Sequence, residues 1–155
     1  MKYLDHSCSL IKASSGDLAL FLGPASATKI ARAQEILGIK FPSAYREFLE
    51  AYGHGMIGPF EIYGITPGDS DPGSDALDAV GLTMADRKFG LPKEFVAVYN
   101  LGNGEDYVLD PTMGQDPPVY AWSPGVGSDR TLMDEVYPSF SRFFLDRVEE
   151  AMKEA

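Results

Sequence analysis

The pattern of apolar positions predicts two short amphipathic helices in the first third of the chain. In the first, Ile30 and Leu37 lie on one face at helical spacing, and Ser26 precedes them as a potential N-cap. Gly38 then supplies the left-handed position at which many helices end. We therefore expect a helix over residues 27–37.

A second helix is predicted after an extended link. Pro42 disfavours the helical conformation for Phe41 and so separates the two helices. Ser43 is the expected N-cap of the second helix, and Gly53 is the residue that ends it. The apolar stripe of this helix has helical spacing and comprises Tyr45, Phe48, Leu49 and Tyr52.

The rest of the first half holds shorter patterns. Residues 3–14 are weakly helical, whereas residues 18–22 are compatible with either a strand or a packed loop. Alternation over residues 59–65 predicts a strand, and residues 66–75 form a turn-rich acidic loop. Residues 76–89 have a helical pattern, whose apolar positions are Leu77, Val80 and Met84.

The second half is dominated by strands and ends in a helix. Strands are predicted over residues 95–100, 105–110 and 117–122, and short turns between strands favour an antiparallel sheet. The terminal helix is predicted over residues 139–152, and its apolar face comprises Phe140, Phe143, Phe144, Val148 and Met152. We expect a single α+β domain over residues 1–155, with helices packed on a mainly antiparallel sheet.

This succession of apolar, glycine and proline positions resembles the SUKH superfamily, which includes fungal cell-wall-synthesis regulators and many bacterial toxin-immunity proteins. In the first half the likeness rests on Ile30, Leu37, Gly38, Pro42, Tyr45, Phe48, Leu49 and residues 53–55. In the second half it rests on residues 96–100, 102–104, 106–110, 118–122 and 139–145. The matching segments keep the same order and span residues 26–150.

The resemblance implies a non-catalytic domain that binds another protein. The first hypothesis is an immunity protein that binds and occludes a bacterial toxin, such as a nuclease. The alternative is a regulatory scaffold like the fungal members of the superfamily. A short single domain favours the immunity protein, because a signalling scaffold usually carries further interaction segments.

Charge is distributed unevenly along the chain. The net charge is −10, and residues 59–110 alone carry 10 acids and 3 bases, a net charge of −7. Such a segment repels phosphate backbones, so direct nucleic-acid binding is not expected. The same charge favours association with a basic protein partner, such as a toxin domain. The alternative, that the acids serve only solubility, stays open on the sequence alone.

Acidic side chains between the strands and turns are the candidates for contact with such a partner. If the acidic loop lies beside the hairpin turn at 102–106, these carboxylates form one negative face. An exposed strand at 59–65 or 117–122 is expected to offer edge pairing as well. Trp122, at the end of a strand, suits either the core or a binding surface. The candidate contact residues are Glu61, Asp69, Asp71, Asp75, Asp78, Glu105, Asp106 and Trp122.

Two segments resemble catalytic or cofactor-binding motifs, but neither lies in the structural context that its motif requires. Residues 53–58 spell G-x-G-x-x-G but follow a predicted helix, whereas a dinucleotide site needs this motif after a strand. Residues 121–125 resemble a nucleophile elbow, but His6 and His54 both precede Ser123, and that fold requires its histidine later in the chain. We therefore expect no enzymatic activity.

Metal-binding patterns are incomplete as well. His6 and Cys8 are not followed by further ligands at zinc spacing. In the loop at 69–75, Gly73 occupies a position at which a calcium loop needs an acid or amide. We expect no metal and no cofactor, with Cys8 as a buried small hydrophobic residue and His54 as a loop residue.

Cysteine content and the N-terminus bear on the compartment. A single cysteine excludes an internal disulfide and fits a reducing compartment. The N-terminal segment has no continuous apolar stretch and carries Asp5, unlike a secretory signal. No apolar run approaches the roughly 20 residues needed to span a bilayer. We expect a cytoplasmic protein that does not bind membranes.

Overall fold

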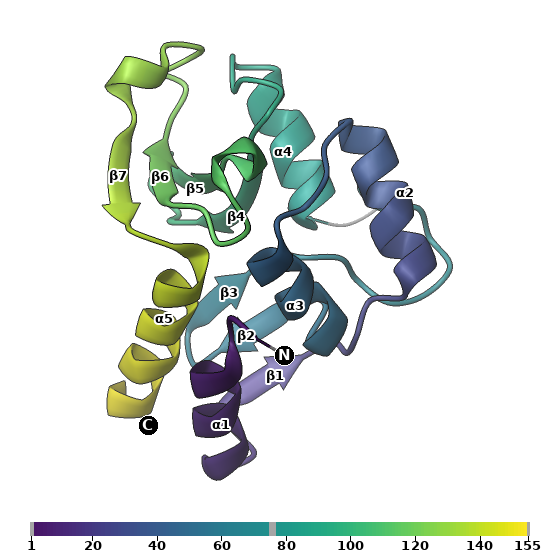
Figure 1. The fold of residues 1–155 in the computed structure, drawn as a ribbon, viewed down its shortest axis with the longest axis vertical. Coiled ribbons are helices and arrows are strands. Elements are labelled where there is room, and N and C mark those ends of the chain that lie inside the picture. The colour runs from purple at the N-terminus through teal and green to yellow at the C-terminus, as the bar shows by residue number, and fades with distance from the viewer. Residues whose placement is uncertain (1, 75–76, 155) are drawn as a thin grey trace.

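Two antiparallel sheets and the helices packed on them make up the fold (Figure 1). The computed structural model describes residues 2–74 and 77–154. The first sheet has the strand order β1 (Ala19–Phe21), β2 (Gly55–Ile57), β3 (Phe60–Ile62). The second has the order β4 (Val96–Asn100), β5 (Asp106–Leu109), β6 (Val119–Trp122), β7 (Asp134–Tyr137). The predicted α+β fold is confirmed.

The first sheet continues towards the second through the end of β3. The backbone N–H of Tyr63 donates to the carbonyl oxygen of Val98 at 2.9 Å, which sets β3 beside β4. Strand β6 is paired on both sides, with β5 and with β7. The expectation of a free edge at 117–122 is therefore wrong, because β6 is a central strand. Strand β3 does lie at the edge of its three-stranded sheet, as expected for 59–65, although Tyr63 just beyond it is bonded to β4.

Helices lie on both faces of the second sheet. The helices are α1 (Asp5–Ala13), α2 (Ala27–Leu37), α3 (Ser43–Ala51), α4 (Ala79–Arg87) and α5 (Phe140–Glu154), with short 3-10 turns η1 (Pro111–Met113) and η2 (Arg130–Leu132). On one face the ring of Tyr107 lies 5.7 Å from that of Phe143 in α5. On the other face, Thr83 of α4 accepts a hydrogen bond from the backbone N–H of Ala97.

Local signals explain where α2 begins and ends. The Ser26 hydroxyl accepts a hydrogen bond from the backbone N–H of Lys29, and Gly38 has a φ of 70°. Both details confirm the prediction for this helix.

The predicted N-cap of α3 is wrong. Pro42 occupies the cap position, and Ser43 is the first helical residue. Gln115 takes over the role of the cap: its side-chain oxygen accepts from the N–H of Ser43 at 3.0 Å, and its carbonyl accepts from Ala44 at 2.9 Å. A loop distant in sequence thus satisfies the first N–H groups of this helix.

An aromatic cluster centred on Phe48 forms the middle of the core. Its ring lies at centroid distances of 5.5 to 6.3 Å from those of Phe21, Tyr45, Tyr52, Phe140 and Phe144. The predicted stripes of α3 and α5 therefore meet each other, which fixes the angle between the helices. Met152 is the exception in α5, because it is 40% exposed whereas Ala151 is buried.

The apolar face of α4 differs from the prediction. Leu77 precedes the helix and is 66% exposed, and Met84 is 45% exposed. The buried face instead comprises Ala79, Val80, Leu82, Thr83 and Asp86. A hydrophobic pattern overlooks this face because two of its members are polar and one is alanine.

Two strands complete the comparison with the sequence-based expectations. Residues 18–22, left open between strand and loop, contain β1. Strand β7 was not predicted, because the sequence DEVY is mostly exposed at a sheet edge and lacks apolar alternation. No helix in the described ranges combines the length and apolarity that crossing a bilayer requires.

Candidate functional site

The predicted contact residues separate into exposed and buried groups. Asp69 and Asp71 are exposed, and Glu61 and Glu105 are partly exposed. Asp75 lies outside the described residues. The remaining three, Asp78, Asp106 and Trp122, are 3%, 5% and 1% exposed. A surface role for these three is contradicted by their burial, and each has a structural role instead.

Asp78 is the N-cap of α4. Its carboxylate accepts from the N–H of Gly81 at 2.8 Å and from the N–H of Gly73 at 2.9 Å. One acid thus starts the helix and fixes the preceding loop to it. This need for a buried acceptor explains why an acid lies inside the protein at this position.

Asp106 on β5 pairs with another acid. Its carboxyl group lies next to that of Asp86 on α4, and Asp86 is 9% exposed. Burial and the adjacent Asp106 raise the pKa of Asp86 to about 9. The pair therefore holds a proton at neutral pH, and it contributes less negative charge than two free carboxylates.

Trp122 belongs to the core. Its indole N–H donates to the carbonyl oxygen of Gly127 at 2.8 Å. This bond holds the Gly- and Pro-containing loop after β6 against the sheet. Of the two roles left open for this residue, the structure places it in the core.

The loop that carries Asp69 and Asp71 lies against α2. Arg32 of that helix is 3.5 Å from the Asp71 carboxylate, and the Lys29 ammonium donates to the carbonyl oxygen of Thr66. An open groove of about 390 Å³ lies between the loop and the helix. The charged contacts of this loop are to α2 rather than to the hairpin turn at 102–106, so the single negative face expected from the sequence is not formed by these contacts.

Glu61 on β3 is the candidate acid with the best-defined surroundings. The Oε2 atom of Glu61 lies 2.9 Å from Nε2 of His54. Burial raises the pKa of the Tyr63 hydroxyl, and Glu61 is close enough for its charge to raise this pKa further. The Glu61 side chain is 42% exposed, so it faces solvent while its position is fixed.

His54 lies between α3 and β2 as expected, but it is only 4% exposed. The backbone N–H of Gly64 donates to Nδ1 of His54 at 2.9 Å, so this nitrogen carries no proton. The ring is then neutral, with its proton on Nε2 donated to Glu61. Both ring nitrogens are engaged inside the fold, which leaves neither for proton transfer with a substrate.

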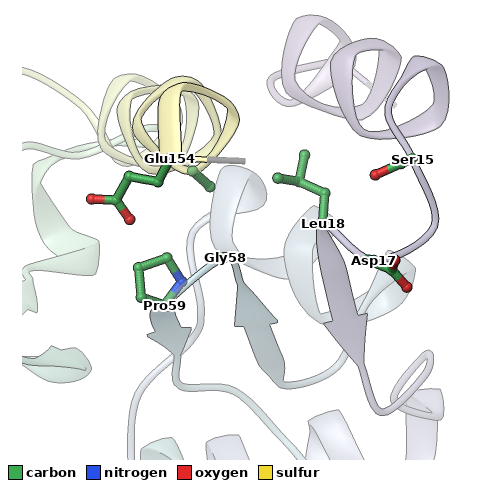
Figure 2. A pocket seen from close by; sticks show the side chains of 7 residues that line it. Ser15, Asp17, Leu18, Gly58, Pro59 and Glu154 are labelled. Atoms are coloured by element: carbon green, nitrogen blue, oxygen red, sulfur yellow. The ribbon is translucent and has the colours of Figure 1, made fainter.

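A shallow groove lies at the end of the first sheet that is farther from His54, where β1 begins and where β2 turns into β3. It has a volume of about 280 Å³ and is lined by Leu18, Gly58, Pro59 and Ala151, with exposed Ser15, Asp17 and Glu154 at its rim. Figure 2 shows Leu18 and Pro59 on opposite sides of it, beside the end of α5. The sequence contained no signal for this groove, because distant segments contribute its lining. Its polar side chains are all exposed, so the groove offers no fixed polar anchor.

The described part of the chain contains no cluster of side chains suited to binding a metal ion. Within residues 2–74 and 77–154, no three His, Cys, Asp or Glu side chains gather in a way that could hold an ion. Cys8 is buried in α1.

Comparison with known proteins agrees with the sequence pattern. The SUKH_5 family model, described as SMI1-KNR4 cell-wall, matches residues 7–149. The chain belongs to the SUKH family. A crystal structure of a protein from Pseudomonas syringae pv. tomato resembles the SUKH domain described here with a TM-score of 0.54 and 20% sequence identity. The alignment covers 75% of this chain and 80% of that one, and it shows a shared fold. No curated protein matches the sequence significantly.

Family membership confirms the resemblance and narrows the function to a general class. SUKH domains act in general through protein–protein interaction. The sites to consider in this SUKH domain are therefore surfaces that another protein can contact. The sequence identified the exposed acids among them, but it gave no reason to consider His54 or the apolar side chains beside Glu61.

Proposed function

We propose that this SUKH domain is a non-catalytic immunity protein that binds and occludes a basic bacterial toxin domain, such as a nuclease, in the cytoplasm. The observation that carries the proposal is the uneven negative charge. Residues 59–110 have a net charge of −7, and the carboxylates of Glu61, Asp69, Asp71 and Glu105 in that segment reach the surface at least in part.

The chemistry of such a target complements this surface. A nuclease site contains Lys and Arg side chains that bind phosphate groups, and exposed carboxylates form the same charge-assisted hydrogen bonds. The long-range field of a domain with a net charge of −10 also accelerates encounter with a basic protein. Binding alone then suffices for neutralisation, because a bound domain blocks the access of substrate.

The polar groups near the surface support a binding role over catalysis. His54 uses both ring nitrogens within the fold, and Asp86 and Asp106 bind each other. Such groups position structure and charge, and none of them leaves an acid–base pair open to a substrate.

A regulatory scaffold is the second candidate. It is favoured by the description of the matching family model, which names the cell wall. The two candidates differ in partner: the immunity protein binds a toxin and restores growth, whereas the scaffold binds cell-wall or signalling proteins without a toxin.

Co-expression tests the immunity proposal. A bacterial host carries an inducible gene for a basic toxin domain chosen as the candidate partner, with or without the SUKH domain. We expect growth to be restored by the SUKH domain and not by an unrelated acidic domain of similar charge. If the toxin kills the host while the SUKH domain accumulates as a folded protein, the proposal is wrong and the scaffold becomes the leading candidate.

A further inference from the structure

One face of the first sheet exposes apolar side chains around Glu61. The register pairs Leu20 of β1 with Met56 of β2, and Met56 with Glu61 of β3. Residues directly opposite each other in antiparallel strands project from the same face, so these three form a row across the sheet. Leu22 extends the row along β1, where its N–H continues the ladder to the carbonyl oxygen of His54. We refer to Leu20, Leu22, Met56 and Glu61 as the open face.

The opposite face of the same sheet packs against the core, although Ala19, Phe21 and Phe60 on it are only partly buried. Phe21 stacks on Tyr52 with ring centroids 4.4 Å apart, and Ile57 and Ile62 are 0% exposed. In Figure 1, α1 and α3 lie in front of these three strands. This side of the sheet therefore builds the core, as its apolar residues require.

The open face is uncovered within the described part of the chain. Leu20 and Leu22 are 66% and 56% exposed. Neighbouring exposed leucines on an ordered strand are costly in water, which is typical of a surface that another molecule covers.

Glu61 gives this surface a charge preference. Its carboxylate is held by His54 before any partner arrives, so little side-chain entropy is lost on binding. Nδ1 of His54 accepts the N–H of Gly64, so the ring donates a hydrogen bond to Glu61 without adding a positive charge beside it. Asp71 is different, since Arg32 already pairs with it.

We propose that the open face is the docking surface for a basic protein partner that places a Lys or Arg side chain on Glu61 and apolar side chains on Leu20, Leu22 and Met56. This inference rests on the proposed function and names the surface that carries it. The apolar residues exclude water from the ion pair, and the fixed carboxylate selects a cation over an anion. The loop with Asp69 and Asp71 then adds steering charge rather than the central contact.

Calorimetric titration with the purified toxin domain tests this surface. Leu20→Ser is expected to weaken binding about 10-fold, and Glu61→Lys about 100-fold or more. The matched controls change the same residue types elsewhere: Leu132→Ser in η2, where Leu132 is 57% exposed, and Glu135→Lys on β7, which is also exposed. Both controls are expected to bind within about 2-fold of the unmodified protein.

The outcomes separate this inference from the proposed function. If the unmodified domain binds the toxin and both open-face variants bind equally well, the docking surface is wrong and the immunity function stands. If the unmodified domain does not bind the toxin, the function fails and the surface with it. Leu20→Ser removes no hydrogen bond, so it remains informative if Glu61→Lys fails to fold. A homodimer in solution that Leu20→Ser dissociates would also overturn the inference, because a second copy would then cover this face.

Discussion

The carboxyl groups of Asp86 on α4 and Asp106 on β5 lie next to each other, and both residues are buried. Two acids in contact are stable only if they share a proton, and burial of Asp86 strengthens this requirement. The pair joins α4 to the second sheet, so its protonation state affects the stability of the whole fold.

The stability of the domain should therefore fall as the pH rises. The pKa of Asp86 is raised from 3.8 to about 9 in the folded protein, so the folded state binds more protons than the unfolded state between these values. The contribution is complete below about pH 4 and is lost as the pH rises through about 9.

Asp86→Asn removes the ionisation and keeps a donor to Asp106. Thermal unfolding at pH 5, 7 and 9 should show its melting temperature rising relative to the unmodified protein, by about 2–4 °C per kcal/mol. Asp69→Asn is the control, and a difference that stays constant with pH would contradict this account.

For Asp110 we predict a contribution to stability with the opposite pH dependence. Burial raises the pKa of Asp110, but hydrogen bonds from Thr112 and Arg130 outweigh it and hold this pKa below 3.8. Its stabilising contribution is present above the unfolded value and is lost as the pH falls through the folded value. Arg130→Ala leaves a carboxylate that is 1% exposed without its cation, and we expect a loss of about 2–4 kcal/mol at pH 7. Urea unfolding at pH 7 and pH 3 measures this. The loss should shrink at pH 3, which lies below the unfolded pKa of 3.8, and an equal loss at both values would exclude the ion pair as its cause.

Gly64 and Gly53 approach each other too closely for a side chain. A Cβ atom at position 64 would lie 1.7 Å from the carbonyl oxygen of Gly53, which also accepts the N–H of Ile65 at 2.8 Å. Gly64→Ala should therefore destabilise the fold by at least about 3 kcal/mol, because backbone must move to admit the methyl group. Gly16→Ala is the control, since nothing lies within 4 Å of the added atom. Denaturant unfolding of both variants decides: a loss below about 1 kcal/mol for Gly64→Ala would show that this region relaxes easily.

Glu47 on α3 fixes the N-terminal segment. Its carboxylate accepts hydrogen bonds from the backbone N–H groups of Lys2, Tyr3 and Leu4 at 2.9–3.1 Å. Glu47→Ala should cost about 1–3 kcal/mol and increase hydrogen exchange in α1 before the rest of the domain. Glu50→Ala, an exposed acid on the same helix, should leave exchange in α1 unchanged. Equal exchange in the two variants would mean that α1 is held by its apolar contacts alone.

Much of the fold could be predicted, because the residues that favour a helix locally also supply the apolar contacts that the core needs. The stripes of α3 and α5 are strongly apolar, and both meet at Phe48. Strand β7 could not be predicted, since an edge strand with exposed Asp134 and Glu135 needs no apolar alternation.

The candidate site was harder to predict than the fold. From the sequence alone, Asp78 and Asp106 are two more negative charges. Only the structure shows that Asp78 caps a helix and that Asp106 shares a proton with Asp86. The row of Leu20, Met56 and Glu61 depends on strand register, which residues so far apart in the sequence do not reveal. Glu61 was identified as an acid, and its fixed position beside His54 follows only from the turn between β2 and β3.

Titration of the toxin's own activity tests the central claim most directly. The purified toxin domain is assayed with increasing amounts of the SUKH domain at low and at high salt. We expect complete inhibition near one equivalent at low salt, and an association rate that falls at least about 10-fold at high salt as charge steering is screened. A toxin that stays fully active with excess folded SUKH domain would contradict the claim that this protein acts by occluding a basic toxin.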